Sequence, residues 1–145
     1  MENIPSLSEC FEILKEKKLH ITFAESCTGG LCAKALTDLA GASEVIEASV
    51  VSYSNRIKIE KLGVKAETIE KHTEVSAECA LEMARGAKKF AAAEVGAALT
   101  GCGTERKRRR TCFCRRQFPV RRRSRRIAAA RVEGRNKAYG GKPLF

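Results

Sequence analysis

The chain has 145 residues, a length suited to one domain, and a net charge of +11 from 28 Lys and Arg against 17 Asp and Glu. No apolar run approaches the roughly 20 residues that a membrane-spanning helix needs, and the acidic N-terminus lacks the apolar core of a secretory signal. The seven cysteines are odd in number and lack the spacing of a disulfide framework, which favours reduced thiols in a cytoplasmic protein.

The charge is divided unevenly along the chain. Residues 1–101 hold 12 basic and 15 acidic side chains, whereas residues 102–145 hold 16 basic and 2 acidic ones, and 13 of those 16 are Arg. A single globular domain rarely changes composition so abruptly. We therefore expect a folded domain over residues 1–101 and an Arg-rich, disordered tail over residues 102–145.

The expected elements of the domain alternate between helices and strands. In chain order the first half comprises a helix that begins at the capping-box pair Ser6 and Glu9, a strand over 21–24, a helix over 31–39 that Gly41 ends, and a strand over 45–53. The second half comprises a short helix that Asn55 caps and that runs through Leu62 before Gly63, a helix over 65–72, a long helix that Ser76 caps, and a strand over 94–100. This alternation predicts an α/β domain with three layers, α/β/α, that is incomplete at its C-terminal end. Its ligand site should lie where loops leave the carboxyl ends of the strands.

The first strand exit carries the sequence E-S-C-T-G-G, which begins at Glu25. Gly29 and Gly30 at the start of a helix let backbone N–H groups approach an anion, which the helix dipole also favours. Ser26 and Thr28 place two hydroxyls at the same point, beside the Glu25 carboxylate. An ordinary capped turn, in which the hydroxyls bond only local backbone, has the same composition. The pattern alone leaves both interpretations open.

The second strand exit, S-Y-S-N-R-I-K, begins at Ser52 and ends at Lys58. Lys58 lies one helical turn beyond Ser54 and Asn55, and a lysine near a serine can act as its base when burial lowers the pKa of the amine. Tyr53 is placed to orient a substrate. A capped helix with a solvated lysine accounts for the same spacing, so this pattern also has two interpretations.

Two further features complete the candidates. Thr100 and Gly101 stand at the end of the last expected strand and form the third polar strand exit. His72 lies in a polar segment and has no Cys or acidic partner at the spacing of metal ligands, so we expect it at the surface and expect no metal site.

Three motifs resemble the CinA C-terminal domain family, whose members include competence- and damage-inducible proteins and a nicotinamide mononucleotide deamidase. They are A-E-S-C-T-G-G, V-S-Y-S-N-x-x-K-x-x-x-L-G-V and V-S-x-E-x-A-x-x-M-A-x-G, in the family's order and spacing, within residues 8–101. The resemblance implies a cytoplasmic amidohydrolase of pyridine nucleotide salvage. Its reaction would convert the carboxamide of nicotinamide mononucleotide to the acid and release ammonia, with neither cofactor nor metal.

The resemblance also implies roles for particular residues. Ser26 would be the nucleophile and Lys58 its base, although Thr28 and Ser54 remain alternative nucleophiles. The substrate would lie against residues of all three strand exits, namely Glu25, Thr28, Gly29, Gly30, Tyr53, Ser54, Asn55, Thr100 and Gly101. Amide hydrolysis needs an activated hydroxyl and aligned N–H donors, and the substrate phosphate suits a helix N-terminus. A homo-oligomer is compatible with this interpretation, and no membrane partner is expected.

After Gly101 the chain departs from the family's motifs, and three interpretations compete. A shifted reading frame is compatible with this departure, because one permitted choice of codons for residues 110–124, read one nucleotide later, encodes an alternating strand like the family's. Without that strand we expect marginal folding and weak or absent amidase activity. Alternatively, the 16 cations form an arm that binds nucleic acid non-specifically in a non-enzymatic protein. A zinc site on Cys102, Cys112 and Cys114 is the third interpretation, without a matched second ligand pair.

Overall fold

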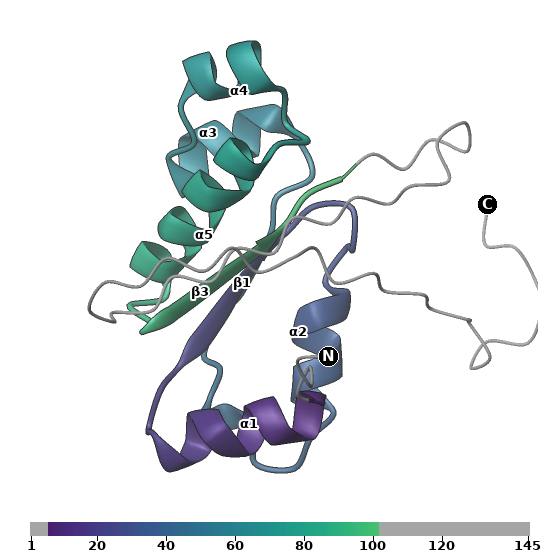
Figure 1. The fold of residues 1–145 in the computed structure, drawn as a ribbon, viewed down its shortest axis with the longest axis vertical. Helices are drawn as coiled ribbons and strands as arrows, with labels where there is room; N and C mark the ends of the chain where they lie inside the picture. The colour runs from purple at the N-terminus through teal and green to yellow at the C-terminus, as the bar shows by residue number, and fades with distance from the viewer. Residues whose placement is uncertain (1–5, 102–145) are drawn as a thin grey trace, which may run out of the picture.

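A computed structural model of the chain describes residues 6–101 (Figure 1). In chain order the elements are α1 (Leu7–Glu16), β1 (Ile21–Glu25), α2 (Leu31–Thr37), the short 3-10 helix η1 (Ala42–Glu44), β2 (Ser49–Val51), α3 (Asn55–Leu62), α4 (Ala66–His72), α5 (Ala77–Phe90) and β3 (Val95–Leu99). All the expectations for residues 102–145, namely the disordered tail, the frame shift, the basic arm and the zinc site, lie outside the described residues.

The three strands form one parallel sheet in the order β2-β1-β3. In its register, Phe23 of β1 lies beside Ser49 of β2 on one side and beside Ala97 of β3 on the other. Because the strands are parallel, their carboxyl ends share one edge of the sheet. The residues that follow β1, β2 and β3 therefore come together at that edge, although they are far apart in the sequence.

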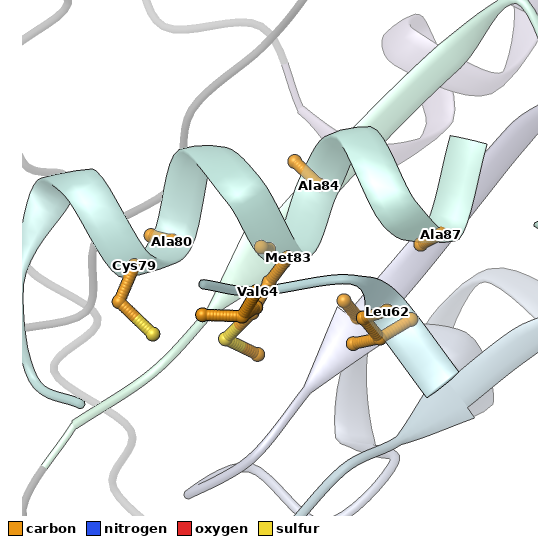
Figure 2. Close-up of a cluster of buried hydrophobic side chains, with 9 residues drawn as sticks. Leu62, Val64, Cys79, Ala80, Met83, Ala84 and Ala87 are labelled. Atoms are coloured by element: carbon orange, nitrogen blue, oxygen red, sulfur yellow. The ribbon is translucent and has the colours of Figure 1, made fainter. Parts of the chain in front are cut away.

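Helices cover both faces of the sheet, which confirms the expected three-layer α/β/α arrangement (Figure 1). On one face, α1 and α2 pack over a cluster formed by Phe11, Leu14, Leu36, Val45 and Val95. On the other face, α3, α4 and α5 pack over a second cluster, part of which is labelled in Figure 2: Leu62, Val64, Cys79, Ala80, Met83, Ala84 and Ala87. Successive residues of β1 serve opposite faces, since Phe23 packs with the first cluster and Ala24 with the second.

Small residues let α5 lie close to α3. A Cβ atom added to Gly86 would lie 1.9 Å from the carbonyl oxygen of Leu62, the last residue of α3. Only a residue without a side chain fits this contact, so Gly86 sets the distance between the two helices. This packing matters for the site because α3 carries Lys58.

Most of the expected helix ends are confirmed. The capping box of Ser6 and Glu9 is present, the Ser76 hydroxyl caps α5, and Gly63 ends α3 with a left-handed φ of 65°. The residue that caps α3 is Ser54 rather than Asn55, because the Ser54 hydroxyl accepts a hydrogen bond from the Ile57 N–H. The helix expected over 31–39 is shorter and ends at Thr37.

The strand expected over 45–53 is wrong in its first half. Gly41, with a left-handed φ of 82°, leads into the 3-10 helix η1, and only Ser49–Val51 pairs with β1. Val45 is fully buried, but under α1 and α2 rather than within the sheet. β-branched, apolar residues indicate burial, and here a turn packed against helices provides that burial as well as a strand would.

Candidate active site

Hydrogen bonds tie the three strand exits together at the carboxyl edge of the sheet. The Ser26 N–H donates to the Leu99 carbonyl at 3.0 Å, and the Ser52 N–H donates to the Glu25 carbonyl at 2.7 Å. These contacts continue the sheet pairing by one residue beyond β1 and β2. Ser26 therefore lies between the ends of the two neighbouring strands, as the position of a ligand site in a parallel sheet requires.

The side chains of Ser26 and Lys58 meet in the interior of this edge. The Lys58 Nζ lies 3.1 Å from the Ser26 Oγ, and the two residues are 1% and 6% exposed. The same amine donates to the carbonyl oxygens of Ser52 at 2.9 Å and Tyr53 at 3.3 Å. Among residues 6–101, no carboxylate forms an ion pair with Lys58. The interpretation of Lys58 as a solvated surface lysine is wrong.

Burial dominates the electrostatics of Lys58. Desolvation lowers the pKa of the amine from its ordinary value, and the charges of Cys79, Glu74 and Cys27 oppose this effect to a lesser degree. The buried Cys79 thiol has a pKa raised by its own desolvation. A lowered pKa increases the fraction of neutral amine near neutral pH, and only the neutral amine can accept a proton.

Glu25 occupies the start of α2 with its own carboxylate. Its Oε1 accepts a hydrogen bond from the Ala33 N–H at 2.9 Å, and its Oε2 accepts from the N–H groups of Cys32 at 3.1 Å and Gly30 at 3.2 Å. The Glu25 side chain is fully buried. The N–H of Gly29 donates to the Ser26 carbonyl at 3.2 Å. The backbone donors of both glycines, which the sequence suggested for an anion, are therefore engaged within the protein.

Thr28, two residues after Ser26, has a hydroxyl without a partner among residues 6–101. Its Oγ1 is shielded from solvent, yet it makes no hydrogen bond to any residue in the described range. A buried polar group without a partner is unusual in folded proteins and calls for an explanation. A ligand that supplies the missing hydrogen bond is one such explanation, which supports the expected role of Thr28 in binding.

The remaining candidates lie around this centre with different exposure. Tyr53 is 79% exposed, Asn55 is exposed at the start of α3, and Gly101 is half-buried after β3. Thr100 is fully buried, and its hydroxyl donates to the Glu74 carbonyl at 2.7 Å. The Ser54 hydroxyl serves as the α3 cap, and the Lys58 amine contacts Ser26 instead.

Two residues near the site were missed by the sequence reasoning. Glu74, between α4 and α5, joins the β3 exit through Thr100, and its charge acts on Lys58. Cys79 is buried in the first turn of α5, where its N–H donates to the Ser76 hydroxyl. The available signal was the position of Cys79 three residues after the Ser76 cap, on the buried side of the helix.

Metal ligation and membrane insertion find no support in the described part of the chain. No three or more His, Cys, Asp and Glu side chains within residues 6–101 are grouped so that they could hold a metal ion. In the same range, every helix is too short or too polar to cross a bilayer. His72 is exposed at the end of α4, as expected.

Curated proteins share this sequence over much of the described domain. A CinA-like protein of Fervidobacterium nodosum is 44% identical over 122 residues, which cover 72% of this chain and 30% of that protein. A CinA-like protein of Kosmotoga olearia is 45% identical over 89 residues, which cover 61% of this chain and 22% of that protein. The chain thus spans less than a third of the length of these relatives.

Solved structures share both the sequence and the fold. The competence/damage inducible protein CihA from Agrobacterium tumefaciens superposes with a TM-score of 0.66 at 36% identity, covering 72% of this chain and 67% of that one. A competence-damaged protein (CinA) superfamily protein from Escherichia coli superposes with a TM-score of 0.66 at 35% identity, covering 68% and 58%.

The family match covers most of the chain. Residues 5–111 match the model of the CinA C-terminal domain, so the match extends ten residues beyond Gly101, after which the chain was expected to depart from the family. Together with the relatives and the solved structures, this match shows that the chain belongs to the CinA C-terminal domain family.

Proposed function

We propose that this protein is an amidohydrolase that converts nicotinamide mononucleotide to nicotinate mononucleotide and ammonia. The observation that carries the proposal is the buried contact of 3.1 Å between the Ser26 Oγ and the Lys58 Nζ. A hydroxyl beside an amine of lowered pKa is the arrangement that nucleophilic attack on an amide requires. The choice of substrate rests on the motifs that the chain shares with its family.

The surroundings of Lys58 suit it to act as the base. A neutral amine has two N–H bonds and one lone pair, and the carbonyls of Ser52 and Tyr53 can only accept hydrogen bonds. When these carbonyls take both N–H bonds, the lone pair faces the third neighbour, Ser26. Lys58 can then receive the Ser26 proton as Oγ attacks the carboxamide carbon.

The rest of the reaction follows from this proton transfer. Collapse of the tetrahedral intermediate breaks the C–N bond, and Lys58 returns the proton to the leaving nitrogen, which departs as ammonia. The Ser26 acyl ester is then hydrolysed by water, with Lys58 as the base once more. Water supplies the oxygen of the new carboxylate, and Ser26 regains its proton.

Two residues of the same strand exits suit the other parts of the substrate. The Thr28 hydroxyl, which has no partner in the described part of the chain, is the candidate donor to the oxyanion that develops on the amide oxygen. Tyr53 is 79% exposed, carries an aromatic ring and directly follows Ser52, whose carbonyl accepts a hydrogen bond from Lys58. The pyridinium ring of the substrate carries a positive charge, and such cations bind well over aromatic faces.

The test is ammonia release from nicotinamide mononucleotide by the full chain. Because weak activity is expected, the assay uses high protein concentration and long incubation, and mass spectrometry identifies the acid product. We expect activity in the wild type, none in Ser26→Ala, and wild-type activity in Ser43→Ala, which removes an exposed serine of η1. A wild type that releases no ammonia, or a Ser26→Ala variant that retains the full rate, contradicts the proposal.

Two further variants distinguish Ser26 from the alternative nucleophiles Ser54 and Thr28. Ser54→Ala removes the α3 cap and should lower stability by about 1 kcal/mol while leaving the chemistry of Ser26 in place. Thr28→Val removes the candidate oxyanion donor and should lower kcat by about 100-fold without abolishing acyl-enzyme formation. Trapping of the acyl group on Ser54 or Thr28 would move the nucleophile to that residue.

A further inference from the structure

We propose that Glu25 positions Ser26 for catalysis and does not itself bind the substrate. This inference rests on the proposed function, and it replaces the sequence-based expectation that Glu25 lines the substrate pocket. Glu25 is the last residue of β1 and is bonded directly to Ser26. Its side chain and its backbone make contacts with two other parts of the site.

The side chain joins β1 to the start of α2. Both carboxylate oxygens accept hydrogen bonds from backbone N–H groups, those of Gly30, Cys32 and Ala33, at 2.9 to 3.2 Å. These groups lie at the helix end that carries partial positive charge and would otherwise lack partners. Glu25 therefore supplies the anion for this helix end from within the protein.

The backbone of Glu25 joins β1 to the segment that holds Lys58. Its carbonyl accepts from the Ser52 N–H at 2.7 Å and lies 3.5 Å from the Ser52 hydroxyl. The carbonyl of Ser52 in turn accepts from the Lys58 amine. A single residue thus connects the turn that carries the nucleophile to the strand exit that orients the base.

The consequence is a rigid turn around Ser26. The turn runs from Glu25, the last residue of β1, to Gly30, which directly precedes α2. A hydrogen bond from the Gly30 N–H to the Glu25 carboxylate joins the two ends of this turn. Within it, the Gly29 N–H donates to the Ser26 carbonyl at 3.2 Å, and the Ser26 N–H donates to Leu99. Misplacing a reacting group by about 1 Å lowers rates by up to about 100-fold, so this closure bears on catalysis.

A direct role in substrate binding does not fit these contacts. Glu25 is fully buried, and a ligand could reach its carboxylate only by displacing the start of α2. The same contacts exclude the substrate phosphate from this helix end, because a carboxylate already occupies it. We therefore place the phosphate elsewhere along the carboxyl edge of the sheet.

The test compares variants by two readouts, steady-state kinetics and the rate at which a fluorophosphonate labels Ser26. Glu25→Gln keeps the size of the side chain, but its NH₂ group faces backbone N–H donors and cannot accept from them. We expect both kcat and the labelling rate to fall by about 100-fold while KM changes by less than about threefold. Peptide mass spectrometry confirms that the label is on Ser26.

Thr22→Val is the matched control. Thr22 is equally buried in β1, and its hydroxyl donates to the Ala48 carbonyl at 2.9 Å, away from the turn. Its loss should lower the melting temperature without changing the labelling of Ser26. Glu25→Asp serves if the Gln variant does not fold, because it keeps the charge at the helix but is one methylene too short to hold all three contacts. We expect slower labelling from the folded Asp variant as well.

Each outcome bears on a distinct claim. Folded Glu25 variants with wild-type labelling and kcat overturn the positioning role, as does a raised KM with unchanged kcat, which would make Glu25 a substrate ligand. The positioning role is also overturned if the fluorophosphonate labels the wild type no faster than the Ser26→Ala variant, because Ser26 is then not a reactive nucleophile. If Ser26 is labelled but nicotinamide mononucleotide is not hydrolysed, the proposed function fails, and the labelling comparison still decides the role of Glu25.

Discussion

The amine of Lys58 and the hydroxyl of Ser26 lie 3.1 Å apart inside the protein, although 32 positions separate them in the chain. Lys58 lies in the first turn of α3, and Ser26 directly follows the central strand β1. A buried lysine that has only uncharged hydrogen-bond partners among the described residues is unfavourable as a cation, which is why its pKa is lowered. Groups perturbed in this way are concentrated at functional sites.

Replacing Lys58 by Met should remove the base while keeping a side chain of similar length. We expect kcat/KM for nicotinamide mononucleotide to fall by about 10²–10⁴-fold, the usual contribution of a general base. Lys61→Met is the control, because Lys61 lies on the same helix but is exposed. Equal losses in the two variants would show that the effect is not specific to the buried amine. Ammonia release, with circular dichroism to verify folding, is the measurement.

Glu74 should shift the pH at which the site becomes active. Its charge raises the pKa of Lys58 against the larger effect of burial, so Glu74→Gln should lower that pKa further. The neutral amine then persists to lower pH, and the acidic limb of the kcat/KM profile should move to lower pH. Glu78→Gln, at an exposed position in α5, should leave the limb in place. A shift of the Glu74→Gln limb to higher pH would contradict this account.

Lys58 should also make stability depend on pH. The folded-state pKa lies below the ordinary value of 10.5, so between these two values the unfolded chain binds more protons than the folded one. The free energy of unfolding therefore rises with pH across this window. Because Lys58→Met cannot titrate, urea unfolding should show the wild type gaining stability relative to this variant as pH increases toward 10.5. A constant difference would indicate an ordinary pKa.

The contact between α5 and α3 gives a prediction about packing. Alanine is intrinsically better than glycine inside a helix by about 1 kcal/mol, yet the Cβ of Gly86→Ala would lie 1.9 Å from the Leu62 carbonyl oxygen. We expect a net destabilisation of about 1–3 kcal/mol in urea unfolding, together with reduced activity because α3 carries Lys58. Arg85→Ala, at the exposed neighbouring position, should change stability little. A Gly86→Ala protein as stable as the wild type would show that α5 can move away freely.

Local chemistry was readable from the sequence wherever neighbouring residues decide the structure. A capping box needs only Ser6 and Glu9 three positions apart, and a left-handed helix end needs only a glycine such as Gly63. The same kind of reasoning failed at Val45, because an apolar run indicates burial without specifying whether a strand or a turn provides it. The two layers of helices followed from the alternation of elements, since parallel strands require crossover helices.

The candidate site depended on more than spacing. Helical periodicity placed Lys58 beside Ser54, whereas the Lys58 amine contacts Ser26, and only the family motifs had pointed to that pair. Likewise, Glu25 and Thr28 shared one polar turn, but the structure gave the carboxylate three partners and left the hydroxyl with none among the described residues.

By itself, the sequence determined most of the elements, several of their ends and the three polar strand exits, because these depend on backbone preferences and short-range side-chain contacts. Only the tertiary structure decided which of those residues are buried and which atoms they contact. The physical reason is the parallel register of the sheet, which brings the ends of distant strands to one edge. That edge removes the Lys58 amine from water and places it beside Ser26, and no local pattern encodes the resulting change in its pKa.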